Sequence, residues 1–150
     1  MQNDSENFNR GNQAEELQLQ KHGLEKNYNT LREIDPKTGI EGATIPDALK
    51  NEGKSTSEIK LVKEQSLTKQ LRLQERFSNS HGLKPELIIN EEAYLTRPLI
   101  HSSFEIKTYN FKNEGGEISG EIRSYSTQNQ NLGKRNENHP KFGAEPKPNF

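Results

Sequence analysis

A predicted strand, turn, strand and helix within residues 45–74 constrain the fold more strongly than any other part of the sequence. Residues 57–63 alternate well enough for a strand, and Glu58 and Lys60 fall on the same face of it. Residues two apart on one face of a strand are separated by about 6.5–7 Å. A carboxylate and an ammonium group can therefore reach one small site from the same strand.

A second carboxylate lies close by in the sequence. Asp47 follows Pro46 and is separated from Glu58 by ten residues. A hairpin around residues 51–54 would return Asp47 close to Glu58. The two carboxylates and the backbone carbonyl of Ile59 would then form a hard-oxygen site suited to Mg²⁺.

A magnesium ion at this site can lower the pKa of a bound water and shield phosphate charge. Lys60, beside it, can orient that water or stabilise developing negative charge. The alternative is a surface ion pair between Glu58 and Lys60, worth about 0–1 kcal/mol. Glu-x-Lys occurs by chance in charged proteins, and Pro-Asp is a common turn dipeptide. In that case the chain is a non-catalytic module that binds nucleic acid or protein through a basic helix face.

The helix predicted from Ser66 to about Ser80 carries two glutamines inside its apolar arc. On a helical wheel, Gln70 and Gln74 lie among the leucines and Phe77. A buried amide without a partner costs about 1–3 kcal/mol, so these glutamines need a role. The role is either the metal site or a water or backbone partner in the sheet. We assign Gln70 to the catalytic site, as support for its ligands, and use Gln74, one turn on and equally inward, as the internal control.

Basic residues in the same unit are candidate contacts to a nucleic-acid backbone, namely Lys63, Lys69 and Arg72. On the helix, Lys69 and Arg72 lie opposite the apolar arc. A basic stripe of this kind is more often a solvated face than a phosphate contact. The whole chain has a net charge of -1, so any attraction to nucleic acid must be local.

The rest of the sequence predicts an α+β or α/β domain with a mixed sheet of four to five strands. One helix precedes the sheet and one crossover helix follows the Glu-x-Lys strand. The first three strands are expected to form an antiparallel meander, the fourth to be buried and parallel to the third, and the last to be half-exposed. The helix is expected from residue 13 and the strands at 28–34, 40–49, 55–63, 86–90 and 104–111, with a hairpin partner at 118–125.

Composition limits the size and the setting of this domain. Only 27% of the 150 residues are hydrophobic, so the core cannot include the whole chain. We predict a disordered lead or linker over residues 1–12, a single folded domain over 13–125 and a disordered polar tail over 126–150. The absence of cysteine excludes disulfides and thiolate metal sites. No apolar run is long enough to span a membrane, and no membrane partner is expected.

The order Pro46-Asp47, ten residues, Glu58-Ile59-Lys60 resembles the PD-(D/E)xK signature of restriction-endonuclease-like nucleases. Residues 66–72 are similar to the helix that follows this signature in nuclease toxin domains of bacterial polymorphic toxin systems. The similarity extends to residues 23–27 and 95–99 and covers roughly residues 20–112. One departure is Thr44, because these domains often carry an arginine two residues before the Pro-Asp.

The resemblance implies an endonuclease that uses Mg²⁺, or Mn²⁺ as a substitute, with DNA favoured over RNA. Asp47, Glu58 and the carbonyl of Ile59 would bind the metal, Lys60 would serve the attacking water, and Gln70 would support the site. Glu25 is a further candidate ligand, because an acid on the first helix sometimes joins the metal site of such nucleases. The resemblance also implies a toxin domain delivered within a larger secreted protein, acting in the target-cell cytoplasm, with a cognate immunity protein as partner.

Overall fold

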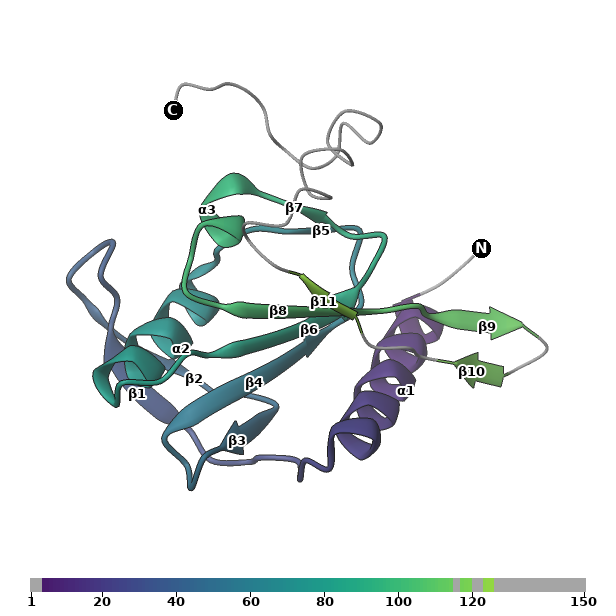
Figure 1. The fold of residues 1–150 in the computed structure, drawn as a ribbon, viewed down its shortest axis with the longest axis horizontal. Helices are drawn as coiled ribbons and strands as arrows, with labels where there is room; N and C mark the ends of the chain where they lie inside the picture. The colour runs from purple at the N-terminus through teal and green to yellow at the C-terminus, as the bar shows by residue number, and fades with distance from the viewer. Residues whose placement is uncertain (1–3, 115–116, 120–122, 126–150) are drawn as a thin grey trace.

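The computed structural model describes residues 4–114, 117–119 and 123–125, and its centre is a five-stranded mixed sheet (Figure 1). The strand order is β11-β8-β6-β4-β3. The three inner strands are parallel, and each edge strand pairs antiparallel with its neighbour. The strands are β3 (Ala48–Lys50), β4 (Ser55–Lys60), β6 (Glu86–Asn90), β8 (Glu105–Tyr109) and β11 (Arg123–Tyr125).

One helix packs on each face of the sheet. The helix α1 (Asp4–His22) covers an apolar cluster that includes Ala14, Ile59 and Ile88. The helix α2 (Lys69–Ser80) joins β4 to the parallel strand β6 and contributes Leu71 to a second cluster. Successive strand residues point to opposite faces of a sheet. Leu87 and Ile89 therefore pack in the cluster with Leu71, and Ile88 packs in the cluster under α1.

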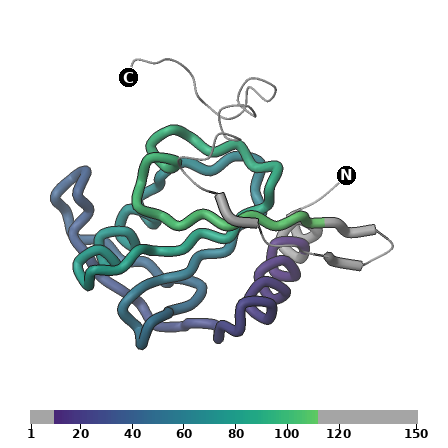
Figure 2. The backbone as a smooth tube through the Cα atoms, in the orientation of Figure 1, coloured from purple at the N-terminus to yellow at the C-terminus, as the bar shows by residue number. Residues whose placement is uncertain are grey.

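Shorter elements surround this core. The strands β1 (Leu31–Ile34) and β2 (Glu41–Thr44) form an antiparallel hairpin that lies next to α2. Figure 2 shows the tip of this hairpin extending away from the main sheet. The remaining elements are β5 (Glu64–Gln65), β7 (Tyr94–Leu95), α3 (Arg97–Ile100), β9 (Lys112–Glu114) and β10 (Glu117–Ser119). None of the described helices is long and apolar enough to cross a membrane.

The predicted architecture is confirmed in its central part. The sheet is mixed, and α2 is the crossover between parallel strands β4 and β6. Thr68 caps the N-terminus of α2, because its side chain accepts a hydrogen bond from the backbone of Leu71. The Glu-x-Lys strand β4 is thus an interior strand, between β6 and the edge strand β3, with one face turned toward α2.

Three expectations about the first half of the chain are wrong. The helix begins at Asp4, so residues 4–12 are not a disordered lead. Their polar composition is compatible with a helix whose apolar face is narrow. The expected strand over 40–49 is interrupted at 45–47, because Pro46 has no N–H to donate and the N–H of Asp47 bonds to a side chain. The β1–β2 hairpin also forms a separate sheet instead of a meander with β3 and β4.

The last predicted strand also differs from expectation. β8 is parallel to β6 and largely buried, with Ile106, Thr108 and Tyr109 all under a tenth exposed. β11 pairs with its other edge, so β8 is an interior strand and not a half-exposed border. The predicted tail over residues 126–150 and part of the expected strand at 118–125 lie outside the described residues.

Candidate active site

Two hydrogen bonds between the segments that carry them hold Asp47 and Glu58 together. An oxygen of the Asp47 carboxylate accepts a hydrogen bond from the N–H of Ile59 at 2.8 Å. The carboxylate of Glu58 accepts one from the N–H of Asp47 at 3.2 Å. These reciprocal bonds exist because β3 starts directly after Asp47 and pairs antiparallel with β4. The predicted hairpin therefore brings the two carboxylates to one site.

Lys60 completes the expected trio. Its ammonium nitrogen lies 3.6 Å from a carboxylate oxygen of Glu58, in agreement with their shared strand face. The lysine is partly exposed, whereas Glu58 is only 3% exposed. The carboxylate of Glu58 thus lies at the buried base of the site, and the ammonium group of Lys60 extends toward solvent.

The lysines near the two carboxylates do not offset the effect of burial on their pKa values. Burial, and then the negative charge of Asp47, raises the pKa of Glu58 to about 7, although Gln74 and Lys60 oppose the shift. Burial also raises the pKa of Asp47, against the hydrogen bond from Ile59 and the charge of Lys26. A divalent cation would supply the charge that this site lacks.

Both glutamines of α2 contact Glu58. Gln70 donates to one carboxylate oxygen at 3.3 Å, and Gln74 donates to the other at 3.0 Å. Gln74 also donates to the hydroxyl of Thr44 at 3.3 Å. Gln74, chosen as the internal control for Gln70, therefore points inward as expected and also contacts Glu58. Residues four apart on a helix share one face, so both amides reach the same acid.

Lys26 is a site residue that the sequence analysis missed. Its ammonium group contacts Glu15 of α1 and lies 3.4 Å from the carboxylate of Asp47. The next residue, Asn27, fixes the backbone here, because its side chain donates to the carbonyl of Pro46 at 2.9 Å. Glu15 lies 32 positions before Asp47 in the sequence, and only the packing of α1 reveals the connection.

Glu25, the candidate ligand on the first helix, does not reach this cluster. The helix ends at His22, and Glu25 follows it in an exposed segment. The acid of α1 that approaches Asp47 is Glu15, through Lys26. Gly23, with a φ of 66°, turns the chain after the helix and separates Glu25 from the helical face.

Of the three expected nucleic-acid contacts, Arg72 is paired within the protein. Its guanidinium makes two hydrogen bonds of 2.8 Å to Asp35. These bonds hold the pKa of the buried Asp35 well below its usual range. The arginine thereby fastens the β1–β2 hairpin to α2. A solvated helix face was expected, but the hairpin covers this position.

Lys63 and Lys69 remain exposed and available to solvent. The stem of Lys69 lies over Gly42 on β2, where an added Cβ would come within 2.7 Å of its Cε atom. The hairpin therefore packs against the lysine stem, and the ammonium group lies at the surface.

The protein supplies few metal ligands of its own. Within the described residues, no group of three or more histidine, aspartate or glutamate side chains is arranged to hold a metal ion. Mg²⁺ commonly takes only one or two carboxylates, and waters and substrate phosphate oxygens complete its shell. The Asp47–Glu58 pair fits that chemistry. The buried Oε1 atom of Gln74 has no partner among the described residues, which leaves an acceptor for water beside Glu58.

Comparison with known families identifies the family of this chain. A family model described as restriction endonuclease fold toxin 7 matches residues 11–99. The chain belongs to this family. The match includes the carboxylate pair, Lys60 and both glutamines of α2, so the resemblance drawn from the motif is confirmed. A search of curated proteins and a search of solved structures found no match. Membership among restriction endonuclease fold toxins supports a nuclease toxin, and this fold usually implies use of a divalent metal.

Proposed function

We propose that this restriction endonuclease fold toxin is a metal-dependent endonuclease that hydrolyses phosphodiester bonds, with DNA as the favoured substrate. The observation that carries the proposal is the pair of half-buried Asp47 and buried Glu58, whose pKa values are both raised and which lies beside Lys60. Structural carboxylates are normally neutralised by the protein itself. A pair left with raised pKa values is typical of a site that acts on an external group.

Asp47, Glu58 and the backbone carbonyl of Ile59 would hold the metal. The ion, Mg²⁺ or Mn²⁺ in its place, would supply a low-pKa water and charge shielding for phosphate. Lys60 reaches the solvent-facing side of the carboxylates, where it can orient a water or stabilise negative charge on phosphate oxygens. Gln70 fixes the direction of the Glu58 carboxylate through its hydrogen bond.

The biological setting that we propose follows from the family. A toxin domain of this kind would be delivered within a larger secreted protein and would cut nucleic acid in the cytoplasm of a target cell. The producing cell would need a cognate immunity protein to block the site. The metal, the preference for DNA and the competition setting are parts of the proposal.

The experiment is incubation of the purified chain with plasmid DNA and, separately, with total RNA, each with Mg²⁺ or with EDTA. We expect cleavage of DNA in Mg²⁺ and none in EDTA. Glu58→Ala should abolish cleavage, whereas Glu105→Ala, at an exposed glutamate on β8, should cut like wild type. Cleavage that persists in EDTA or in Glu58→Ala would refute the proposed site. Binding without cleavage under all conditions would favour a non-catalytic binding module.

A further inference from the structure

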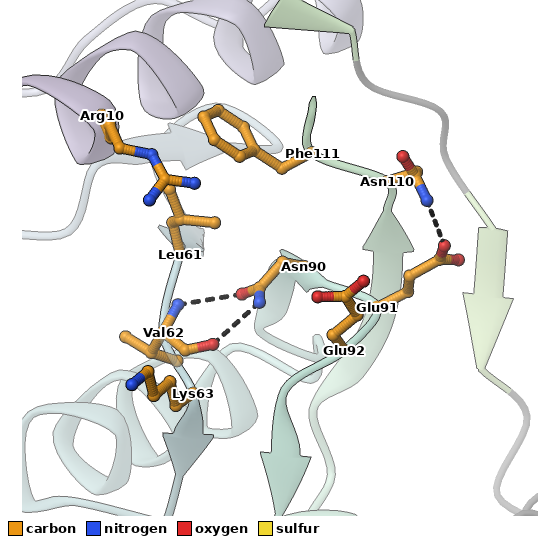
Figure 3. Close-up of a pocket in the computed structure, with 9 residues that line it drawn as sticks. All are labelled: Arg10, Leu61, Val62, Lys63, Asn90, Glu91, Glu92, Asn110 and Phe111. Carbon is orange, nitrogen blue, oxygen red and sulfur yellow. Dashed lines mark hydrogen bonds between the residues drawn. The ribbon is translucent and has the colours of Figure 1, made fainter. Parts of the chain in front are cut away.

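A cavity of about 450 Å³ opens at the carboxyl ends of β4, β6 and β8 (Figure 3). Its volume lies within the range of roughly 300–1,000 Å³ that is usual for small-molecule sites. In open sheets with parallel strands, ligands bind at this edge. The lining comes from the segments that follow the three strands and from α1, namely Arg10, Leu61, Val62, Lys63, Asn90, Glu91, Glu92, Asn110 and Phe111.

The cavity wall is tied to the strand that carries the candidate active site. Residues 61–63 follow Lys60 directly. The side chain of Asn90 accepts from the N–H of Val62 at 2.9 Å and donates to its carbonyl at 2.8 Å, as a paired strand would. The hydroxyl of Tyr109 donates to the carbonyl of Lys60 at 2.7 Å. These bonds fix the position of the wall relative to Lys60.

One side of the cavity is a platform for a flat group. The ring of Phe111 is half-buried, and the guanidinium of Arg10 lies 5.0 Å from its centroid. Leu61 adjoins this pair, and Figure 3 shows the three side chains together on one side of the opening. Aromatic rings and arginine planes are the surfaces on which unpaired bases stack.

The opposite side presents acceptors for hydrogen bonds. The carboxylates of Glu91 and Glu92 lie across from Phe111 in Figure 3, and the Asn110 amide donates to Glu91 at 2.5 Å. Arg10 and Lys63 balance these two acids, so the lining has no excess positive charge. That balance does not suit a phosphate. It suits a planar, uncharged ligand that carries hydrogen-bond donors.

We propose that this cavity binds one unpaired nucleobase of the substrate strand through its exocyclic amino group, an inference that rests on the proposed nuclease function. At about 3.3 Å per strand residue, the cavity wall from Leu61 to Lys63 extends roughly 10 Å along the chain from Lys60. That span equals two or three nucleotides at the ~3.4 Å rise of one strand of a duplex. Cytosine and adenine carry an exocyclic amino group that can donate a hydrogen bond to a carboxylate, and thymine has no such group.

The experiment measures binding without cleavage. Dye-labelled oligo-deoxycytidine, oligo-deoxyadenosine and oligo-deoxythymidine of equal length are titrated by fluorescence anisotropy with the full chain carrying Glu58→Gln, in EDTA. We expect cytidine and adenosine oligomers to bind more tightly than thymidine. Phe111→Leu, added to the Glu58→Gln chain, should weaken the affinity for all three oligomers by roughly 5- to 150-fold, equivalent to about 1–3 kcal/mol per stacked base. Glu92→Gln, added in the same way, should reduce the difference in affinity between the cytidine and thymidine oligomers.

The control is Phe77→Leu, at a half-buried phenylalanine of α2 that lies outside the cavity. Equal affinity for the three oligomers, or equal effects of Phe111→Leu and Phe77→Leu, would overturn the base site. If Phe111→Leu fails to fold, Glu92→Gln at its exposed position decides alone. Plasmid cleavage by the wild type is scored separately: cleavage without base discrimination refutes only the cavity, and base binding without cleavage refutes only the nuclease.

Discussion

Glu58 and Glu86 are buried to nearly the same degree on neighbouring parallel strands, yet their surroundings are opposite. Glu58 is 3% exposed and Glu86 is 1% exposed. Glu86 faces α1, where the ammonium groups of Lys107 and Lys50 lie 2.5 and 3.2 Å from its carboxylate. It also accepts a hydrogen bond from Ser57. Glu58 faces α2 and has two neutral amides, a second acid and one lysine at 3.6 Å.

The pKa values record this difference. Burial alone would raise the pKa of Glu86, but Lys107, Ser57 and Lys50 outweigh burial and lower it. At Glu58 burial and the charge of Asp47 prevail, and the pKa rises to about 7. Equal burial therefore gives two kinds of acid. Glu86 is neutralised within the protein, whereas Glu58 keeps a raised pKa, and we propose that a bound cation neutralises it.

The largest expected effect comes from making the same substitution at both positions. Glu58→Gln should lower the rate of cleavage by at least ~100-fold, because it removes the proposed metal ligand, with no loss of stability in EDTA. Glu86→Gln should cost about 3 kcal/mol, because it leaves two partly buried lysines without their counter-charge. The folded fraction of Glu86→Gln should keep its rate per molecule. Urea unfolding and plasmid cleavage together measure both outcomes.

A reversed result would remove the distinction between the two acids. If Glu86→Gln lost activity while fully folded, its cluster would belong to the chemistry. If Glu58→Gln lost several kcal/mol, its acid would be structural. Lys60→Ala is the additional test on the catalytic side, and it should abolish cleavage without unfolding the chain.

The sequence could reveal one of these acids and not the other. Asp47, Glu58 and Lys60 are joined by a hairpin and by strand alternation, which are local rules that fix geometry over short spacings. Glu86 opens an apolar run after Pro85 and is 36 and 21 positions from Lys50 and Lys107. Nothing in such a run shows which neighbours tertiary packing will supply.

The same limit explains the other errors in prediction. The helical wheel placed Arg72 on a solvated face, but Asp35 meets it across 37 positions of sequence. The polar start of α1 has too few apolar residues to show its periodicity, and the role of Glu15 depends on how that helix docks. Conversely, the crossover helix and its two glutamines were predictable, because their period and their place after β4 are properties of one continuous segment.

The next effect concerns pH and can separate the two acids in a single protein. In EDTA, Glu58 binds a proton in the folded state up to about pH 7, but its ordinary pKa is 4.5. Stability should therefore fall as pH rises from about 4.5 to 7, by as much as about 3 kcal/mol. Asp47, whose pKa is also raised, adds in the same direction. Glu86, with a lowered pKa, contributes stability above pH 4.5 that is lost below it.

Urea midpoints measured across this range test that prediction. Glu58→Gln should flatten the decline between about pH 4.5 and 7, and Glu86→Gln should flatten the loss on the acid side. A wild-type profile that rises steadily from pH 4.5 to 7 in EDTA would contradict the raised pKa of Glu58. Addition of Mg²⁺ should reverse most of the decline, since it favours the ionised carboxylates.

A metal titration gives a somewhat smaller effect. Binding to the folded state alone adds about 2.7 kcal/mol at a concentration 100 times Kd. The melting temperature of wild type should therefore rise with Mg²⁺, and that of Asp47→Ala should not. Glu86→Gln serves as the matched acidic control: it should start lower and still respond. An equal response in Asp47→Ala would place the ion elsewhere.

The smallest expected effects distinguish the two amides that hold Glu58. Gln70→Leu should stay folded and cleave at least ~10-fold more slowly, the lower end of the loss seen when a partner of a metal ligand is removed. Gln74 lies deeper and its hydrogen bond is shorter, 3.0 against 3.3 Å, and that bond lowers the pKa of Glu58. Gln74→Leu should therefore raise the pKa of Glu58 further and shift the pH–rate profile to higher pH. Gln70→Leu should mainly lower the maximal rate of the profile. Identical profiles for both variants would show that the amides act only through packing. An unchanged rate in Gln70→Leu would remove that residue from the site.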